Sequence, residues 1–182
     1  MNREHTVYIS VGSNIGDKLA NCKSGIEALT RSGDNLLENV SGFYRTEPVD
    51  FEDQDWFVNA AVSITTRLDP LALLKELQSI QLRAGLKKKK IRFGPRILDL
   101  DIIFFDDRII NTPDLIVPHP RMHKRRFVLQ PICDIDSSII HPVIKKNVQD
   151  LLDSLDDNGQ GVWHIDKINH IGSPGVFRVQ NR

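Results

Sequence analysis

Asp99 and Asp101, two residues apart in an apolar segment, are the side chains best placed in this sequence to do chemistry. The segment alternates like a β-strand, so both carboxylates should lie on one face, roughly 6.5–7 Å apart along the chain. Leu98, Leu100 and Ile102 should then face the core. Adjacent carboxylates repel each other unless a positive charge lies between them. Magnesium binds to a few carboxylates together with substrate phosphates, and the pair therefore fits such a site.

The alternative for an isolated aspartate pair is a half-exposed strand with an acidic outer face. Here Gly94-Pro95 sets a turn before the strand, and Arg92 and Arg96 flank the acids, which favours the metal site. Basic residues gather in two clusters. The first runs from Arg83 to Arg96 without an acid, and the second comprises Arg121, His123, Lys124, Arg125 and Arg126. Because the net charge is zero, local basic patches indicate a compact polyanionic ligand rather than general affinity for nucleic acid.

The elements that must position these residues follow the order strand, helix, strand, strand, helix, strand. We expect strands over 7–11, 36–44, 56–66 and 97–105, with one helix capped by Asp17 and another capped by Asp69. After the last of these strands we expect a short partner strand over 108–111, a basic amphipathic segment over 122–129 and a last helix over 147–155. This order is typical of an α+β, ferredoxin-like sandwich, an antiparallel sheet with helices on both sides.

Length and composition favour one globular domain, since 182 residues can bury a substantial core. We expect that domain over residues 1–158 and a Gly- and Asn-rich C-terminal tail over 159–182. No apolar run approaches the ~18 residues of a membrane helix, and the charged N-terminus lacks the apolar region of a secretory signal. Cys22 and Cys133 have no metal-binding spacing and are predicted to be buried, reduced thiols. These features predict a cytoplasmic protein.

The segment Arg92-Phe93-Gly94-Pro95-Arg96, followed by Leu98-Asp99-Leu100-Asp101, resembles the signature of the 6-hydroxymethyl-7,8-dihydropterin pyrophosphokinase family of folate biosynthesis. Four more segments agree with that family in order: Gly12-Ser13-Asn14, Phe43-Tyr44-Arg45-Thr46, Phe57-Val58-Asn59-Ala60-Ala61-Val62, and Val117-Pro118-His119 leading to Arg125 and Phe127. The resemblance covers about residues 6–155. It implies transfer of diphosphate from ATP to 6-hydroxymethyl-7,8-dihydropterin, giving AMP and the pterin diphosphate, with two Mg²⁺ ions held by Asp99 and Asp101.

The resemblance also implies which residues meet the nucleotide. The catalytic residues would be Arg96, Asp99, Asp101 and Arg125, and the ATP contacts would be Gln78, Lys88, Arg92, Arg96, Ile102, His119 and Arg125. Basic side chains suit phosphate oxygens and the charge that develops during transfer. Phosphoryl transfer rests mainly on positioning and charge neutralisation, so no protein nucleophile is needed. No P-loop occurs: the segment 12–16 lacks its lysine, and we interpret it as a strand-to-helix turn near the substrate. Gln81 stands where the family commonly has Glu.

For the pterin, the resemblance implies contacts from Thr46, Glu47, Val49, Phe57, Asn59, Phe93, Asp99 and Phe127. A flat heterocycle needs aromatic planes and hydrogen-bonding edges: Phe57 and Phe127 suit stacking, and Asn59 suits pairing with the ring edge. The family often has Tyr at the position of Phe57 and Trp at that of Phe93, so this chain keeps the aromatic surface and loses a polar group. The loops 45–55 and 85–94 bracket these residues and are predicted to close over the substrates.

Two other interpretations stay open at this point. An RNA-binding module would use the sheet aromatics for stacking and the basic run for phosphates, but the acidic pair would repel an RNA backbone without metal, and no RNP-type motif occurs. A non-catalytic pterin-binding remnant, or one module of a fusion with dihydropteroate synthase as occurs in some organisms, is the second. All core motif residues are present, which argues against lost activity. The expected partners are ATP and the pterin, with neither nucleic acid nor membrane.

Overall fold

The computed structural model describes residues 4–49, 53–85, 94–156 and 160–165. Within these residues, six strands form one antiparallel sheet in the order β5-β1-β4-β3-β8, with β2 also paired to β4. The strands are β1 (His5–Ser13), β2 (Asn35–Val40), β3 (Tyr44–Thr46), β4 (Phe57–Thr66), β5 (Asp99–Phe105) and β8 (Val162–His164). A second, two-stranded sheet pairs β6 (Ile110–Asn111) with β7 (Ile116–Val117).

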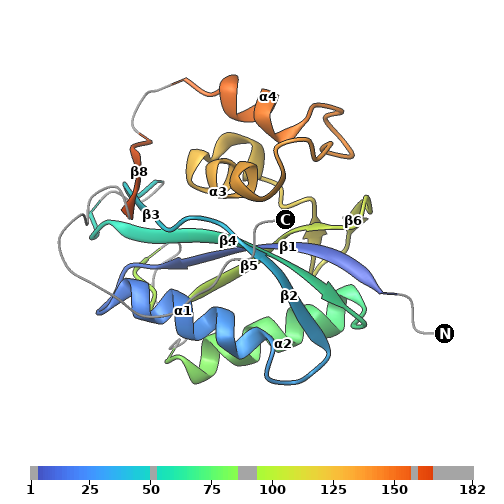
Figure 1. Cartoon of the computed structure of the whole chain (residues 1–182), viewed down its shortest axis with the longest axis horizontal. Helices are drawn as coiled ribbons and strands as arrows, with labels where there is room; N and C mark the ends of the chain where they lie inside the picture. The colour runs from blue at the N-terminus through green and yellow to red at the C-terminus, as the bar shows by residue number, and fades with distance from the viewer. Residues whose placement is uncertain (1–3, 50–52, 86–93, 157–159, 166–182) are drawn as a thin grey trace.

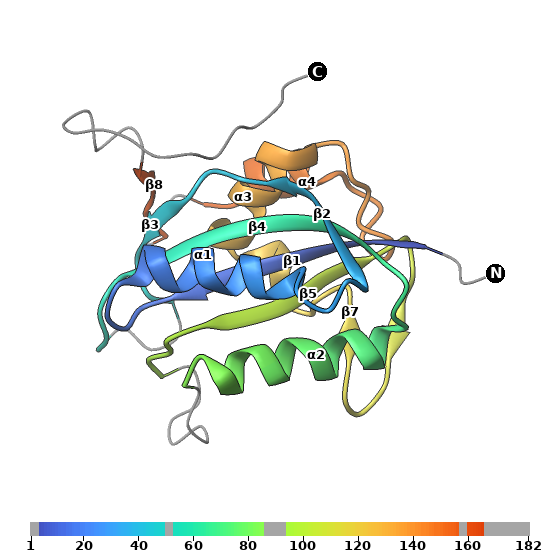
Figure 2. The same ribbon diagram turned by 60° about the horizontal axis from the view of Figure 1, so that its bottom comes forward.

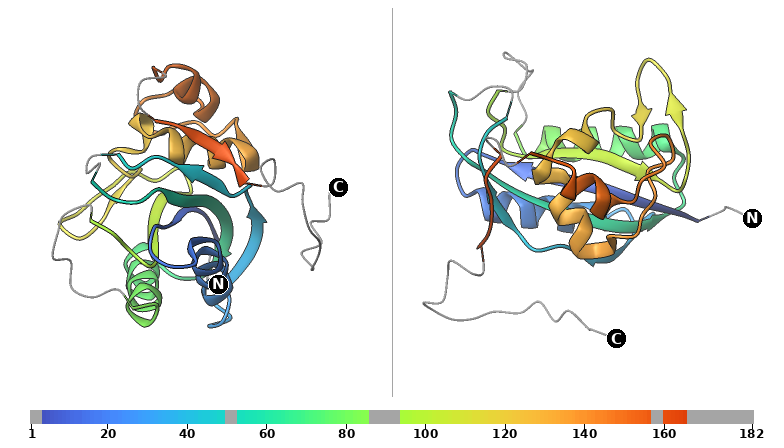
Figure 3. Two further views of the ribbon diagram at one scale, coloured as in Figure 1. Left: turned by 90° about the vertical axis from the view of Figure 1, so that its left-hand side faces the viewer. Right: turned by 90° about the horizontal axis from the view of Figure 1, so that it is seen from above.

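Helices cover both faces of the large sheet, as the α+β sandwich predicted. The helical elements are α1 (Lys18–Leu29), α2 (Pro70–Arg83), the 3₁₀ turn η1 (Met122–Lys124), α3 (Arg126–Asp136) and α4 (Val148–Asp153). Figure 1 shows α1 and α2 on one side of the sheet and α3 and α4 on the other. Figure 2 shows α1 and α2 lying along their face, and the end-on view in Figure 3 shows the three layers.

The two helices of the first layer begin where the sequence predicted. The Asp17 carboxylate accepts a hydrogen bond from the Ala20 backbone, and the Asp69 carboxylate accepts from the first turn of α2, where Pro70 occupies the first position. Their apolar stripes bury Cys22, Ile26, Leu29, Leu73, Leu77 and Ile80 against β1, β4 and β5. A second cluster packs α3 and α4 on the opposite face, against Ala61, Ile103 and Phe104.

The predicted strand over 36–44 is two strands, which corrects the expected element. The Ser41 N–H donates to the Ala61 carbonyl at 2.9 Å, and the Ser41 hydroxyl accepts from the Ala61 N–H at 2.8 Å. The Gly42 N–H instead donates to the Asp134 carboxylate on α3. Side chains thus satisfy the N–H groups of Ala61 and Gly42, and regular pairing with β4 is interrupted between β2 and β3. The predicted loop over 45–55 accordingly starts after Thr46.

Two further expectations change at the chain's second half. The short partner strand predicted over 108–111 does not pair with β5, because Asp106 adopts a positive φ and holds the turn against Thr6, and β6 pairs with β7. The basic amphipathic segment over 122–129 is broken at Arg125, which is extended between η1 and α3. Residues 162–164, in the segment predicted as the C-terminal tail, form β8, which pairs with β3.

The two cysteines differ in environment. Cys22 is buried under the sheet, whereas Cys133 on α3 is half-buried. Burial raises the pKa of the Cys22 thiol to about 12 and that of Cys133 to about 11. Both side chains are therefore protonated thiols at neutral pH, and neither is set up as a nucleophile.

Candidate active site

Strand register brings the predicted site residues onto one face of the sheet. Gly12 on β1 lies directly opposite Asn59 on β4 and also opposite Asp99 on β5, and Ser10 lies opposite Asp101. Directly paired residues of antiparallel strands point their side chains to the same face. The aspartates and Asn59 therefore share the face that α3 and α4 cover only in part.

A pocket of about 240 Å³ opens on this face. The predicted residues that line it are Thr46, Glu47, Val49, Phe57, Asn59, Arg96, Asp99, Asp101, His119, Arg125 and Phe127. They come from β3, β4, β5 and α3, and from the segments after β3, before β5 and before α3, which are far apart in the sequence. The lining combines acidic, basic and aromatic side chains, as a site for a polyphosphate and a flat heterocycle requires.

Other predicted residues do not line this pocket. Gln78 is exposed on α2, and the Ile102 side chain is buried in the core on the opposite face of β5. Lys88, Arg92 and Phe93 lie outside the described residues, as does most of the predicted loop over 85–94. Gln81, on α2, is buried, and its side-chain carbonyl accepts a hydrogen bond from the Leu100 backbone, which ties α2 to β5.

Five residues that the sequence analysis did not assign also line the pocket: Ser10, Gly12, Ile103, Arg121 and Val128. Arg121 belongs to the second basic cluster, so its charge was visible, but spacing alone does not say which arginine of a cluster faces a pocket. Gly12 has a steric role, since a Cβ there would lie 2.7 Å from Oδ1 of Asn59. A side chain at residue 12 would displace the Asn59 carboxamide, which itself donates to the Thr46 hydroxyl at 2.7 Å.

Asp99 and Asp101 are both half-buried on β5, and the structure confirms that they share a face. The Arg96 guanidinium forms a salt bridge with the Asp99 carboxylate, and the Arg96 side chain is 13% exposed. Within the described residues, no three His, Cys, Asp or Glu side chains converge as metal ligands. Two carboxylates beside basic groups do fit magnesium, because this ion is commonly held by one or two carboxylates plus substrate phosphates.

His119 is a half-buried titratable group in the pocket. Burial, reinforced by the charges of Arg125 and Arg121, lowers the pKa of His119 to about 4, while Asp99 acts in the opposite direction. Its Nδ1 accepts a hydrogen bond from the Arg121 backbone at 3.3 Å, so the hydrogen of the neutral ring lies on Nε2. At neutral pH His119 is thus an uncharged hydrogen-bond donor.

Neighbouring arginines have different roles. Arg125 lines the pocket, and its guanidinium carbon lies 5.4 Å from the centre of the Phe127 ring. Arg126 donates from its side chain to the Leu155 carbonyl at the end of α4, at 3.3 Å, and is not among the lining residues. The first can meet a ligand, whereas the second joins two helices.

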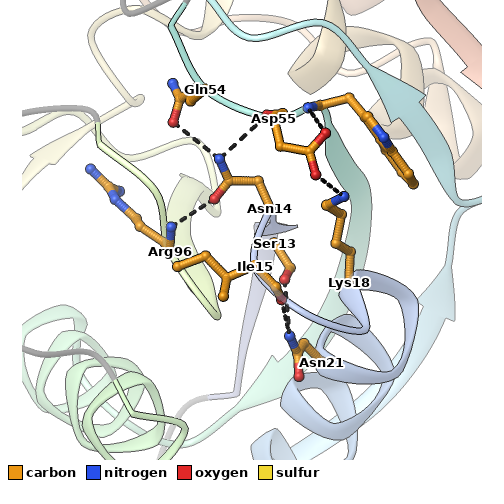
Figure 4. A network of polar contacts seen from close by, with 9 residues as sticks. Ser13, Asn14, Ile15, Lys18, Asn21, Gln54, Asp55 and Arg96 are labelled. Atoms are coloured by element: carbon orange, nitrogen blue, oxygen red, sulfur yellow. Dashed lines mark hydrogen bonds and ion pairs between the residues drawn. The ribbon is translucent and has the colours of Figure 1, made fainter.

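Figure 4 shows a polar network that joins three segments at the edge of the site. The Asn14 carboxamide accepts from the Arg96 N–H at 2.7 Å and donates to the Gln54 side chain at 3.0 Å. The Lys18 ammonium donates to the Asp55 carboxylate at 2.6 Å, and this hydrogen bond lowers the pKa of Asp55. The turn after β1 therefore holds both the segment before β4 and the segment before β5.

Comparison with known proteins identifies relatives of this chain. A family model described as 7,8-dihydro-6-hydroxymethylpterin-pyrophosphokinase (HPPK) matches residues 8–137. The chain is 44% identical over 128 residues to a 2-amino-4-hydroxy-6-hydroxymethyldihydropteridine pyrophosphokinase of Bacillus subtilis, covering 70% of this chain and 76% of that protein. It is 34% identical over 145 residues to a protein of the same name from Aquifex aeolicus, covering 80% of this chain and 89% of that one.

Longer proteins match as well. The chain is 40% identical over 152 residues to the folic acid synthesis protein fol1 of Pneumocystis carinii, which is 84% of this chain but 20% of that protein's length. The crystal structure of a Plasmodium falciparum HPPK-DHPS matches with a TM-score of 0.66 at 16% identity, over 84% of this chain and 46% of that chain. That likeness supports the fold.

Proposed function

The chain belongs to the 7,8-dihydro-6-hydroxymethylpterin-pyrophosphokinase family, and on that basis we propose that it transfers diphosphate from ATP to 6-hydroxymethyl-7,8-dihydropterin. AMP and the pterin diphosphate are the products, and the step belongs to folate biosynthesis. The observation that carries the proposal is the convergence of Asp99, Asp101, Arg125 and two phenylalanines in one pocket.

The aromatic part of the pocket suits the pterin. Phe57 on β4 and Phe127 on α3 both line the pocket, and their rings would stack on a flat heterocycle. Asn59 and Thr46 are buried and hydrogen-bonded to each other, so their polar groups are held in place before a ligand arrives. A preorganised hydrogen-bonding edge of this kind favours one orientation of the pterin ring.

The charged part of the pocket suits the polyphosphate. Asp99 and Asp101 would hold two Mg²⁺ ions, which would neutralise phosphate charge during transfer. The Arg96 guanidinium binds one oxygen of the Asp99 carboxylate, and a metal ion bound at the same carboxylate would compete with it. The Arg96 guanidinium is then expected to turn to the phosphate oxygens, with which its planar fork pairs well.

In the proposed reaction the pterin hydroxymethyl oxygen attacks the β-phosphorus of ATP. The bond between this phosphorus and the oxygen that bridges it to the α-phosphorus breaks, and AMP leaves with that oxygen. Arg96 and Arg125 balance the charge that develops on the phosphates, and neutral His119 can donate a hydrogen bond from Nε2. Positioning and charge compensation are the main needs of phosphoryl transfer, and this lining supplies both.

Product analysis tests the proposal directly. The protein is mixed with ATP, magnesium and 6-hydroxymethyl-7,8-dihydropterin, and equal amounts of AMP and pterin diphosphate are expected. Formation of ADP would mean that a single phosphoryl group is transferred. No turnover, with both substrates still bound, would favour a non-catalytic pterin-binding module instead.

The location and organisation of the chain are part of the same proposal. No helix in the described parts of the chain is long and apolar enough to cross a membrane. We propose a cytoplasmic protein whose catalytic unit spans residues 1–158, with β8 of the following segment added to its sheet. An HPPK unit and a DHPS unit share one chain in the Plasmodium falciparum protein, in agreement with the fusion expected in some organisms.

A further inference from the structure

We propose that Gln160, beyond the expected catalytic domain, is a positioning residue that fixes Arg125 in the pocket. The inference rests on the proposed function, in which Arg125 contacts the ATP phosphates. Gln160 lies more than thirty positions from Arg125 in the sequence, and none of the family motifs includes it.

The Gln160 carboxamide contacts the backbone on both sides of Arg125. Its Oε1 accepts a hydrogen bond from the Arg126 N–H at 2.9 Å, and its Nε2 donates to the Lys124 carbonyl at 3.1 Å. Arg125 is extended, with φ −123° and ψ 102°. In an extended residue the preceding carbonyl and the following N–H point to the same side, so one carboxamide can bind both, as a paired strand does.

One of these hydrogen bonds also caps the start of α3. The first N–H groups of a helix have no partner within the helix, and a side chain usually caps them. Arg125 is the N-cap residue of α3, and its own side chain makes no capping hydrogen bond. Instead, Oε1 of Gln160 accepts the hydrogen bond from the Arg126 N–H and caps the helix. The Arg125 side chain lines the pocket, and the capping hydrogen bond to the Arg126 N–H comes from Gln160.

The segment that carries Gln160 is itself anchored to the sheet. The Gly161 N–H donates to the Glu47 carboxylate at 2.9 Å, and the Glu47 N–H donates to the Gly161 carbonyl at 3.1 Å. The next residues form β8, which pairs with β3, and the Ile165 N–H donates to the Phe43 carbonyl (Figure 1). The segment 160–165 thus joins two walls of the pocket, Glu47 on one side and Arg125 on the other.

Removal of this carboxamide should loosen the backbone of Arg125 without emptying the core. Gln160→Ala is expected to lower kcat/KM for ATP about tenfold, which corresponds to about 1.4 kcal/mol, because a misplaced charge stabilises the transition state less well. Gln160→Glu should also be impaired, since a carboxylate oxygen would face the Lys124 carbonyl. Gln149→Ala is the matched control: its side chain bonds to Asp153 on the surface of α4, away from the pocket.

A double-mutant cycle separates positioning from general stability. If Gln160 acts through Arg125, Gln160→Ala in an Arg125→Ala background should cost less than twofold in kcat/KM for ATP. Losses that multiply instead, or an unchanged kcat/KM in the single Gln160→Ala variant, would overturn the inference. Hydrogen exchange of the Arg126 amide gives a readout that does not depend on activity: it should accelerate in Gln160→Ala and not in Gln149→Ala.

The same experiments distinguish this inference from the proposed function. If the wild-type protein produces no AMP, the proposed reaction fails, and the cycle is repeated on affinity for a non-hydrolysable ATP analogue with magnesium. Weaker binding in Gln160→Ala that disappears in the Arg125→Ala background would still support the positioning role. Absence of analogue binding to the wild type, or unchanged Arg126 exchange in Gln160→Ala, would overturn it.

Discussion

At the scale of single residues, the chemistry depends on groups whose neighbours already set their charge. The Arg96 guanidinium compensates the negative charge of Asp99. Burial, together with two neighbouring arginines, keeps the His119 ring neutral. Asp101 lines the same pocket two residues further along β5. Asp99, one of the two carboxylates of the proposed metal site, therefore also holds the Arg96 side chain in place.

Asp101→Asn tests the metal assignment with least disturbance to the fold. The substitution keeps the size of the side chain and removes the charge that would bind magnesium, so kcat should fall by about 10²–10³-fold. The midpoint of thermal unfolding should change little, because the side chain lies on the pocket face rather than in the core. Steady-state kinetics and thermal unfolding check both statements, and near-normal turnover would refute a role in metal binding.

At the scale of elements, polar side chains hold loops against the neighbouring helices and turns. Lys18, at the start of α1, is 8% exposed and reaches across to Asp55, and its ammonium lies 3.7 Å from the centre of the Trp56 ring. This contact fastens the segment before β4 to the turn after β1. The turn after residue 140 is held similarly, since Nδ1 of His141 accepts from the N–H groups of Val143 and Ile144.

Lys18→Met should make the segment before β4 more mobile. The change keeps the apolar stem and removes the ammonium, so both the ion pair and the cation–π contact are lost. We expect faster hydrogen exchange over residues 53–56 and a KM for the pterin raised about threefold, because Phe57 follows directly. Lys23→Met on the same helix, whose Nζ lies 5.9 Å from the centre of the Phe43 ring, is the control. Equal exchange in the two variants would contradict the prediction.

Protonation of His141 should weaken its turn. Burial, with the charge of nearby His123, lowers the pKa of His141 below its usual 6.5, so the unfolded chain binds a proton more readily than the folded one. The free energy of unfolding should therefore be highest above pH 6.5 and decrease as the pH falls below it. Denaturant unfolding at pH 7.5 and 5.5 measures this change. His141→Asn, which can still accept the two backbone bonds, should show a smaller decrease, and an equal decrease would exclude His141 as a contributor.

At the scale of the whole molecule, one sheet face stabilises the fold and the other carries the site. The face under α1 and α2 is a continuous apolar core. Figure 3 shows α3 and α4 on the opposite face. A second apolar cluster packs these two helices, and the pocket opens on the same face. The residues around the pocket come from segments at both ends of the chain, from Ser10 to Gln160. Ligand binding should therefore stabilise the whole molecule rather than one segment.

Thermal unfolding with and without ligands tests this expectation. Within the described residues the protein itself offers no cluster of three metal ligands, so magnesium alone should raise the unfolding midpoint little. ATP together with magnesium should stabilise by about 2.7 kcal/mol at a concentration of 100 times Kd. Adding a chelator should remove that gain and abolish turnover. A large stabilisation by magnesium alone would indicate that the protein binds the ion without phosphates.

Features that depend on local periodicity were predicted correctly from the sequence. The shared face of Asp99 and Asp101 follows from the two-residue period of a strand, and the starts of α1 and α2 follow from Asp17 and Asp69 as caps. The order of elements and the apolar stripes then determine an α+β sandwich. The motifs, which are short and contiguous, identified the family.

Features that depend on long-range pairing were decided only by the tertiary structure. The opposition of Gly12 to both Asn59 and Asp99 requires a strand register that no local pattern specifies. Neighbouring Arg125 and Arg126 have the same chemistry, and only the direction of α3 sends one to the pocket and the other to Leu155. The contact of Gln160 with the backbone around Arg125 joins residues more than thirty positions apart. Sequence periodicity predicts on which face of an element a side chain lies. Which residue it contacts is determined only when segments far apart in the sequence pack together.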